Sequence, residues 1–319
     1  MIRSVGIIGC GAVIQSSYTE ALGKYDNIVV RYVYDLNKDL AIKVAKIFHA
    51  EVVEKHELLL KSDIIIIATP PSSHFELIKE SLAQGKKIIC EKPFVGTVKE
   101  AEDLIELARN KGAQLFVAHF RRYYPSVLLA QSLVESGVLG KISEIEVYEG
   151  GKFSWQTQSG YVYTDPYGGV LFDTGSHTID MALFVSGLDK TQDFSVDIVD
   201  LSKDKLEPAH HVEAALKINA GTSKIDFKLK LSRRTILANK IRIKGENGHI
   251  DISVQLTNYV RLTGKNGKST VLYSPNSYDY FYDCFASQFK EMFGDVENSI
   301  FSADRFRNLV NVLQVVSKD

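Results

Sequence analysis

Residues 3–14 read RSVGIIGCGAVI, an apolar run that is interrupted by two closely spaced glycines. The run Ser4 to Ile8 predicts a buried β-strand, and Gly9 and Gly11 predict a tight turn directly after it. A mixed polar and apolar stretch from Val13 to Lys24 predicts a helix after this turn. A strand, a glycine turn and a helix in this order are typical of the start of a parallel sheet that helices cover.

The alternation of short strands and helices continues to about residue 118. The continuous apolar run Ile64 to Ala68 is typical of a central parallel strand, because both faces of such a strand meet helices. We therefore expect residues 1–119 to form a doubly wound parallel α/β sheet of the Rossmann type. Further strands are predicted at 28–34, 87–90 and 114–118, and helices at 39–48, 75–84 and 98–111.

The pattern changes after His119, and strands dominate most of the remaining chain. Tight glycine turns at 245–248 and 264–267 predict that neighbouring strands run antiparallel. We expect residues 120–319 to form a second, α+β domain built on an open, mostly antiparallel sheet, with helical periodicity from Tyr278 to Val316. Strands are predicted at 142–148, 211–218, 223–231, 240–244 and 259–263, and a helix at 125–136.

The composition is that of an ordinary globular protein, with 45% hydrophobic and 24% charged residues among 319. The formal net charge of -1, without a basic stripe, argues against nucleic acid or a membrane surface as partners. No apolar run approaches the roughly 20 residues of a membrane helix, and no signal peptide is visible. The three cysteines show no metal-ligand spacing, so we expect no metal site and a reducing, cytoplasmic environment.

The segment Gly9-Cys10-Gly11-Ala12-Val13 has the position of a turn that holds the pyrophosphate of a dinucleotide at a helix N-terminus. Ile14 departs from the pattern, which usually has a third glycine or alanine there. Asp35 ends the second predicted strand, where a carboxylate binds ribose hydroxyls and repels a 2′-phosphate. The sequence therefore predicts NAD as cofactor, with NADP possible, although Asp35 could instead cap the following helix.

Two further segments follow predicted strands and emerge at the same edge of the sheet, where open α/β folds bind ligands. We expect Thr69 and Pro70 to line the cofactor, together with His74 and Glu91. His74 could equally be a helix-start residue with a surface role. Lys92 is positioned to donate to a reacting oxygen and to stabilise an alkoxide, whereas the alternative is an exposed lysine paired with Glu91.

A third stretch, from Gly168 to Asp180, contains two carboxylates and a histidine. If this stretch is helical, Asp173, His177 and Asp180 lie at i, i+4 and i+7 and share one face. A histidine beside a carboxylate is a natural general base for alcohol oxidation and a general acid for the reverse reaction. The alternative is that His177 is a hydrogen-bonded core residue.

Substrate-binding candidates are less specific. Arg122 follows the last Rossmann strand and could hold a phosphate or carboxylate, or could cap the sheet edge. Trp155 lies in an aromatic and polar segment before the third stretch, where such side chains can stack on sugar faces. Trp155 could equally be an edge-strand or interface residue, so we treat Arg122, Trp155 and Asp173 as candidate substrate contacts.

The chain resembles the Gfo/Idh/MocA group of nicotinamide-dependent oxidoreductases, which includes glucose-fructose oxidoreductase and inositol dehydrogenase. This resemblance implies a Rossmann domain followed by a mixed α/β domain whose open sheet often mediates dimer or tetramer assembly. It also implies Lys92, Asp173 and His177 as the catalytic set, with His177 moving the proton. The motifs that carry it are the glycine turn with Asp35, Ala68-Thr69-Pro70 with His74, Glu91-Lys92-Pro93, Arg122 with Pro125, Gly137-Val138-Leu139-Gly140, and Gly168-Gly169 through Asp173 and His177.

Our hypothesis from the sequence is reversible oxidation of a secondary alcohol on a sugar, cyclitol or related polyol, by a homodimer or homotetramer. A non-catalytic dinucleotide-sensing protein would keep the glycine turn and Asp35, but would have no use for Lys92, Asp173 and His177. An S-adenosylmethionine methyltransferase also pairs a glycine loop with an acidic residue after the second strand. Within the family, a keto-sugar, a dihydrodiol-type or an imine-like substrate is an alternative.

Overall fold

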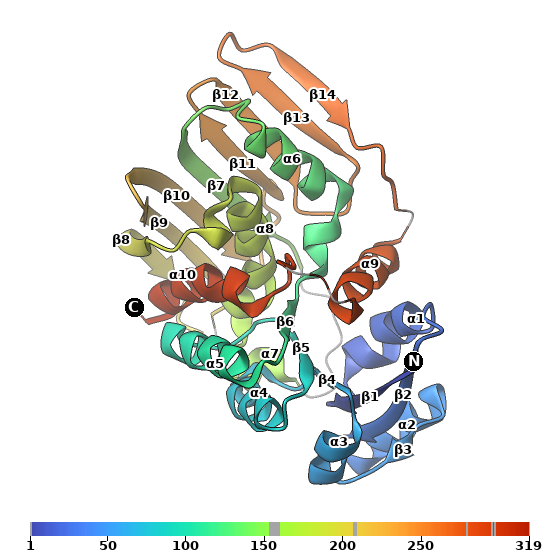
Figure 1. Ribbon diagram of the computed structural model, residues 1–319. Helices are drawn as coiled ribbons and strands as arrows, with labels where there is room; N and C mark the ends of the chain where they lie inside the picture. Colours follow the sequence, from blue (N-terminus) through green and yellow to red (C-terminus); the bar gives the residue numbers. More distant parts are fainter. Residues whose placement is uncertain are drawn as a thin grey trace. The chain divides into compact units, whose positions relative to one another are not determined.

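The structure is a computed structural model, and it forms two compact units (Figure 1). It describes residues 2–152, 160–206, 209–278, 280–294, 296 and 298–318. The described residues of the first unit fall within 1–119, 160–161 and 282–304, and those of the second within 120–152, 162–281 and 305–318. The chain therefore leaves the first unit after residue 119, and its described residues return to that unit at 160–161 and again at 282–304.

The first unit contains a six-stranded parallel sheet with the strand order β3-β2-β1-β4-β5-β6. Every side chain of Ile64–Ile67 is buried, which is expected of a strand with helices on both faces. Burial of each such side chain stabilises the fold by about 1.5–3 kcal/mol. The strands are β1 (Arg3–Ile8), β2 (Ile28–Tyr34), β3 (Glu51–Val52), β4 (Ile64–Ile67), β5 (Lys87–Glu91) and β6 (Leu115–Ala118).

Two helices of this unit, α2 and α5, begin where a capping side chain accepts from their first backbone N–H groups. The Asn37 side chain accepts from the Asp39 backbone N–H at 3.0 Å, and Thr97 and Glu100 form a reciprocal capping box. The helical segments are η1 (Ile14–Tyr18, a π-helical turn), α1 (Thr19–Leu22), α2 (Lys38–Phe48), α3 (Lys55–Lys61), η2 (Pro71–Ser73), α4 (His74–Ala83) and α5 (Val98–Lys111).

Residues from the far end of the chain complete the first unit. Helix α9 (Phe281–Phe293) lies beside α1 (Figure 1), and Tyr25 after α1 donates its hydroxyl to the Ala286 carbonyl. The outer edge of β6 is covered by residues 301–302, because the Val117 N–H donates to the Phe301 carbonyl at 2.9 Å. An edge strand covered in this way offers fewer unpaired backbone groups to other chains.

The second unit contains an eight-stranded sheet with the order β14-β13-β12-β11-β7-β10-β9-β8. Only the pair β7 and β10 is parallel among its described neighbours, so the predicted open and mostly antiparallel sheet is confirmed. The strands are β7 (Ile142–Gly150), β8 (Phe194–Lys203), β9 (His211–Ala220), β10 (Ser223–Ser232), β11 (Lys240–Gly245), β12 (Gly248–Ser253), β13 (Tyr259–Gly264) and β14 (Ser269–Tyr273).

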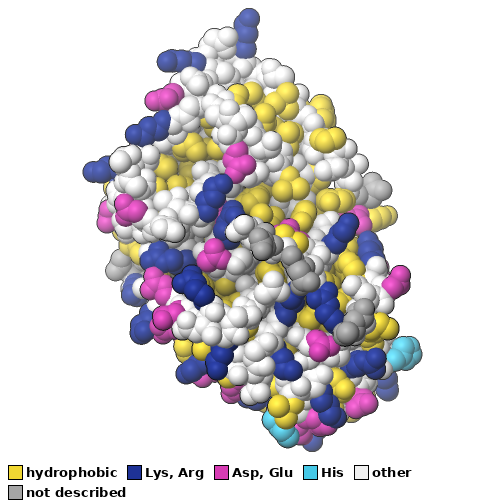
Figure 2. All heavy atoms as spheres, in the orientation of Figure 1, with side chains coloured by type: hydrophobic (Ala, Val, Ile, Leu, Met, Phe, Trp, Pro, Cys, Tyr) yellow, Lys and Arg dark blue, Asp and Glu magenta, His cyan; other side chains and the backbone are white. Residues whose placement is uncertain are grey.

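Three helices cover one face of this sheet: α6 (Pro125–Glu135), α8 (Ser176–Ser186) and α10 (Arg307–Lys318) (Figure 1). The other face carries charged side chains, because strands such as β9 and β10 alternate buried and exposed residues. Lys228 and Glu144 form one of the cross-strand ion pairs on this face. On the molecular face drawn in Figure 2, basic and acidic side chains of the described residues are interspersed. Within the described chain, no helix combines the length and apolarity needed to cross a membrane.

Candidate functional site

The glycine turn after β1 depends on two glycines for different reasons. Gly9 has φ of 93°, and a Cβ built on it would lie 2.6 Å from the carbonyl group of Ala68 and 2.8 Å from the Thr69 nitrogen. Only glycine adopts this conformation and this approach to the β4 loop without strain. For Gly11, no atom of the described residues beyond its chain neighbours lies within 4 Å of such a Cβ. Gly11 therefore leaves its backbone open to a ligand.

Asp35, directly after β2, is held against this turn by two backbone donors. Its Oδ2 accepts from the Cys10 N–H at 2.7 Å, and its Oδ1 accepts from the Asn37 N–H at 2.7 Å. Each carboxylate oxygen has two acceptor sites, so each retains one for a ribose hydroxyl. Burial, with a further contribution from Asp35, raises the pKa of the Cys10 thiol to about 12, so the thiol stays neutral at physiological pH.

These features fit a dinucleotide at the carboxyl edge of the parallel sheet. Its pyrophosphate would meet the open backbone at Gly11 and the start of the helix that includes Ala12 and Val13, and its ribose would meet Asp35. Asp35 does not cap α2, because Asn37 does so. This arrangement favours cofactor binding over helix capping as the role of Asp35.

Exchanging each glycine of the turn for alanine should separate folding from cofactor binding. We expect Gly9→Ala to lower the free energy of unfolding by about 1–3 kcal/mol, because of its positive φ and the backbone overlap. Gly11→Ala should change the free energy of unfolding by less than about 0.5 kcal/mol, but weaken NADH binding about tenfold or more. Thermal denaturation and nicotinamide fluorescence measure the two effects, and unchanged NADH binding by Gly11→Ala would contradict this assignment.

His74, expected at the cofactor, is fully buried at the start of α4. Its Nδ1 lies 2.9 Å from the Pro93 carbonyl oxygen, and its Nε2 lies 3.0 Å from the Thr69 carbonyl oxygen. The ring therefore joins the loop after β4 to the loop after β5. His74, expected to line the cofactor, thus has both ring nitrogens on backbone carbonyls inside the first unit.

Glu91, also expected to line the cofactor, is a buried residue of the first unit. Its carboxylate accepts from the Tyr18 hydroxyl and, through Oε2, from the Lys92 backbone N–H at 3.0 Å. Burial raises the pKa of the Glu91 carboxyl group, although the Tyr18 hydrogen bond and the Lys92 charge oppose that shift. Lys92 itself is partly exposed directly after β5, and a cis peptide bond joins it to Pro93.

The second unit contains Asp173 and His177 on consecutive helical segments. Asp173 lies in a π-helical turn, η4 (Leu171–Gly175), which leads directly into α8. A π turn offsets the residues before it by one helical position, so Asp173 does not keep the regular α-helical spacing to His177 that the sequence pattern predicts, whereas His177 and Asp180 both lie in α8. Asp180 is buried elsewhere, whereas the His177 ring packs edge-on against Phe120 with ring centroids 5.4 Å apart.

An arginine that the sequence did not single out holds Asp173. Arg233 follows β10, is largely buried, and donates from Nη2 to Asp173 Oδ2 at 2.7 Å and to the Gly169 carbonyl at 3.0 Å. An ion pair of this kind fixes the orientation of the Asp173 carboxylate. Asp173 and Arg233 are 60 residues apart, so no local pattern could have revealed the pair.

A second network lies beside His177. Arg121 donates to both carboxylate oxygens of Glu149 at 3.0 and 3.1 Å, and Thr178, the residue after His177, donates its hydroxyl to the same carboxylate. Burial tends to lower the pKa of Arg121, but Glu149 raises it overall, so this arginine stays charged. The network fixes the first turn of α8, on which His177 lies.

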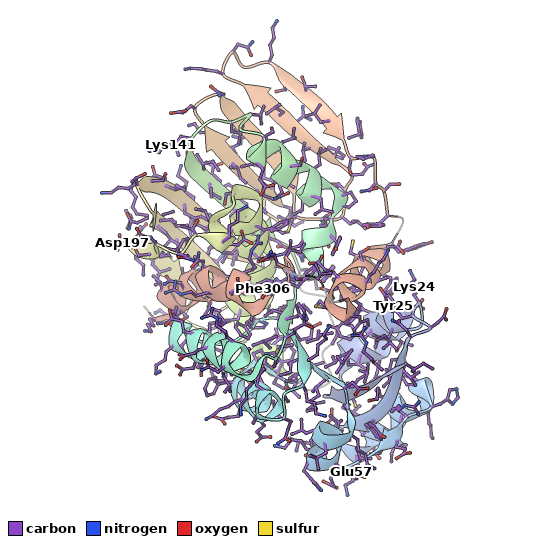
Figure 3. The ribbon with its side chains drawn as sticks, viewed as in Figure 1. Lys24, Tyr25, Glu57, Lys141, Asp197 and Phe306 are labelled. Carbon is purple, nitrogen blue, oxygen red and sulfur yellow. The ribbon has the colours of Figure 1, made fainter. Side chains whose placement is uncertain are left out.

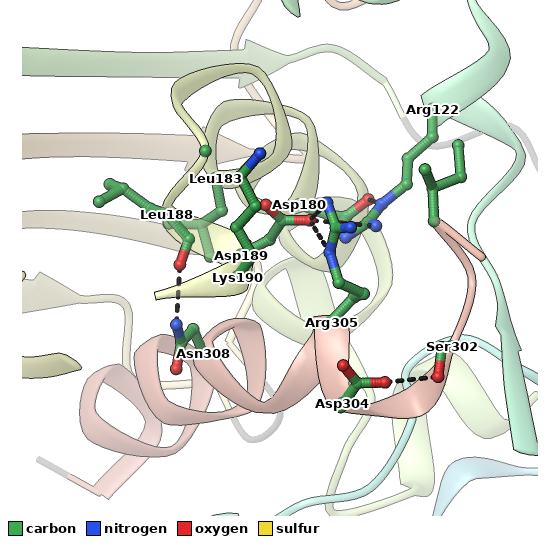
Figure 4. Close-up of polar contacts among 12 residues, drawn as sticks. Arg122, Asp180, Leu183, Leu188, Asp189, Lys190, Ser302, Asp304, Arg305 and Asn308 are labelled. Carbon is green, nitrogen blue, oxygen red and sulfur yellow. Dashed lines mark hydrogen bonds and ion pairs between the residues drawn. The ribbon is translucent and has the colours of Figure 1, made fainter. Parts of the chain in front are cut away.

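Arg122, expected to bind substrate, is fully buried and lies in an ion cluster (Figure 4). Its guanidinium donates to Asp180 at 2.5 and 2.9 Å and lies 3.3 Å from Asp189, which also pairs with Arg305 at 2.6 Å. The rings of Phe184 and Phe306 flank the guanidinium at 4.8 and 4.1 Å. With its donors and both faces engaged and its side chain fully buried, Arg122 has the contacts of a residue that stabilises the second unit. Trp155 lies outside the described residues.

Comparison with known protein families matches both parts of the chain. Residues 3–119 match the model of an oxidoreductase family with a NAD-binding Rossmann fold, named GFO_IDH_MocA. Residues 127–251 match the model of the GFO/IDH/MocA C-terminal domain. The two models describe consecutive domains of one family, in the order in which they occur here.

Individual relatives are similar over part of their length. An uncharacterised oxidoreductase of Schizosaccharomyces pombe is 35% identical over 133 residues, which cover 41% of this chain and 36% of that protein. Glucose-6-phosphate 3-dehydrogenase of Bacillus subtilis is 29% identical over 192 residues, which cover 58% of this chain and 54% of that protein. The chain thus spans about a third to a half of the length of such curated relatives.

Solved structures share the fold over the full chain. KijD10, a 3-ketoreductase from Actinomadura kijaniata solved with NADP and TDP-benzene, superposes with a TM-score of 0.77. The match covers 99% of this chain and 97% of that chain at 20% sequence identity. At this identity the likeness establishes the fold alone.

Proposed function

Because the chain belongs to the Gfo/Idh/MocA family of oxidoreductases with a NAD-binding Rossmann fold, we propose that it transfers a hydride to or from a sugar, cyclitol or related polyol. The reacting group is a secondary alcohol or the corresponding ketone, and the cofactor is NAD. The observation that supports this best is Lys92, which follows β5 at the same sheet edge as the glycine turn after β1. One named relative, a glucose-6-phosphate 3-dehydrogenase, supports a sugar substrate.

In this proposal each residue has a separate task. NAD, when bound, accepts or donates the hydride. Lys92 donates to the reacting oxygen and stabilises negative charge on it. His177 takes the hydroxyl proton during oxidation and returns it during reduction. Asp173, oriented by Arg233, accepts a hydrogen bond from a substrate hydroxyl and fixes the ring.

Titration with NADH and NADPH, followed by nicotinamide fluorescence, tests the cofactor part of the proposal. We expect NADH to bind more tightly than NADPH, because the Asp35 carboxylate repels a 2′-phosphate. Asp35→Ala should weaken NADH binding about tenfold or more and narrow the difference between the two nucleotides. Asn37→Ala, which removes the α2 cap but not the carboxylate, is the control.

Turnover is then measured at 340 nm with NAD and D-glucose, D-glucose 6-phosphate, myo-inositol and UDP-N-acetylglucosamine as probes. Oxidation of any of these by the wild-type protein supports the polyol assignment. Failure to bind either nucleotide would overturn the oxidoreductase proposal, and binding of S-adenosylmethionine in their place would favour a methyltransferase. Binding without any turnover would favour a dinucleotide-sensing protein.

A further inference from the structure

The first unit contains a buried hydrogen-bond chain that ends at the backbone of Lys92. The Tyr18 hydroxyl donates to the Glu91 carboxylate, and that carboxylate accepts the Lys92 N–H at 3.0 Å through Oε2. Tyr18 is fully buried, and Glu91 is 9% exposed. These two hydrogen bonds therefore link η1, the helical turn after the glycine turn, to Lys92, the residue proposed to contact the reacting oxygen.

Tyr18 is itself fixed by residues from the far end of the sequence. Its ring packs edge-on against Phe289 of α9, with centroids 4.6 Å apart, and against Phe285 at 5.8 Å. Edge-on aromatic contacts of this kind restrict the ring orientation, and therefore the direction of the hydroxyl group. The π-helical turn η1 ends at Tyr18 and places its side chain in the protein interior.

We propose that Tyr18 is a positioning residue that fixes Lys92 through the Glu91 carboxylate; its catalytic consequence rests on the proposed function. A buried carboxylate with two donors has one orientation, whereas a buried carboxylate that has lost a donor can rotate or take up a proton. Either change breaks the hydrogen bond from the Lys92 N–H to Glu91 and shifts the backbone of Lys92, and with it the position of the Lys92 side chain. Tyr18 does not touch the reacting atoms and acts only through Glu91.

The chain offers a matched control in Tyr25, which lies after α1 and near Lys24 in Figure 3. Its hydroxyl also donates to a partner in the first unit, the Ala286 carbonyl of α9, and its ring also packs edge-on against a phenylalanine of α9, Phe293 at 5.5 Å. Tyr18→Phe and Tyr25→Phe therefore each remove one buried or half-buried hydroxyl beside α9. Only the first removes a donor from Glu91.

Hydrogen exchange of the Lys92 amide, measured by mass spectrometry on peptides that include Ile89 to Lys92, tests the positioning without cofactor or substrate. We expect Tyr18→Phe to accelerate exchange at Lys92 about tenfold or more, and Tyr25→Phe to leave it unchanged. Equal exchange at Lys92 in the wild-type protein and Tyr18→Phe would overturn the proposal. Equal acceleration in both variants would also overturn it, because that result would indicate loosening through α9.

The catalytic consequence is measured with whichever polyol probe the wild-type protein oxidises. Tyr18→Phe should lower kcat about tenfold while the Kd for NADH changes less than about twofold, because the cofactor contacts at Gly11 and Asp35 remain. Tyr25→Phe should retain the wild-type kcat. If the wild-type protein oxidises no probe, the proposed function fails by itself, and the exchange comparison still decides whether Tyr18 fixes Lys92. A normal kcat in Tyr18→Phe would overturn the catalytic consequence.

Discussion

Lys92→Ala should lower kcat by about 10²–10³ while NADH binding stays within about twofold of the wild-type value. The expected loss is that of one charged donor aimed at an oxygen that becomes negative during the reaction. NADH binding should persist, because the glycine turn and Asp35 lie on β1 and β2, away from the loop after β5. The measurement is steady-state oxidation of a polyol probe at 340 nm, beside nicotinamide fluorescence titration.

Lys86→Ala is the matched control for this variant. Lys86 precedes the other end of β5, and its ammonium donates to the Leu60 carbonyl at 3.0 Å. We expect its removal to leave kcat unchanged, because this contact lies at the opposite edge of the sheet. Full activity of the Lys92→Ala protein would show that Lys92 takes no part in the reaction. If the variant fully retained a biological effect of the protein in the absence of turnover, that result would favour the sensing alternative.

Arg122→Ala should lower the free energy of unfolding by about 3–5 kcal/mol. The substitution leaves the Asp180 carboxylate buried without the guanidinium that pairs with it. Asp189 then keeps Arg305 as its one partner of this cluster. Lys190→Ala is the control, since its ion pair with Glu135 has side chains 54% and 48% exposed and should contribute at most about 1 kcal/mol. Urea denaturation of both variants measures the difference.

The free energy of unfolding of Arg122→Ala should fall as the pH rises. Burial raises the pKa of Asp180 and of Asp189 in the folded protein, and Arg122 opposes that shift in both. Without Arg122, the folded state therefore binds protons more readily than the unfolded state at pH values above the ordinary aspartate pKa of about 3.9. Stability then falls as pH rises through this window. We expect the variant to be closer to the wild-type protein at pH 5 than at pH 7.

A double variant distinguishes an uncompensated charge from lost packing. Arg122→Met with Asp180→Asn removes the guanidinium and the carboxylate together, and Asp189 keeps Arg305 as its partner. We expect the double variant to recover more than half of the stability lost in Arg122→Ala, because no buried charge is left without a partner. Equal instability of the two variants would show that packing between Phe184 and Phe306 is the larger contribution.

The fold was predictable where its sequence pattern was regular. Runs such as Ile64 to Ala68 and the glycine turn at 245–248 correspond to β4 and to the β11–β12 hairpin. Strand β8 was not predicted, because its alternation is interrupted at Val199, which lies in a bulge and is 62% exposed. A bulge shifts the two-residue period by one position, so the apolar residues on its two sides no longer read as one strand.

For the candidate site, the sequence predicted which residue types follow the strands or lie on a helix, but not the contacts that these residues make. The sequence placed Glu91 and His74 next to the cofactor, whereas the structure gives them buried partners, Tyr18 and the Thr69 and Pro93 carbonyls. The contacts of Glu91 with Tyr18 and of His74 with Pro93 join residues 73 and 19 positions apart, so they depend on tertiary packing and leave no local periodicity. The π turn at η4 was equally hidden, since its residues fit an ordinary helix.

The cover of β6 by residues 301–302 has a consequence for biosynthesis. When the ribosome has made the first 119 residues, the outer edge of β6 has no partner, and Tyr18 has neither Phe285 nor Phe289 beside it. At roughly 5–20 residues per second, translation needs on the order of ten to forty seconds more before residue 304 is made. The nascent protein thus exposes a strand edge and an aromatic surface during synthesis, which are the features that molecular chaperones bind and through which chains aggregate.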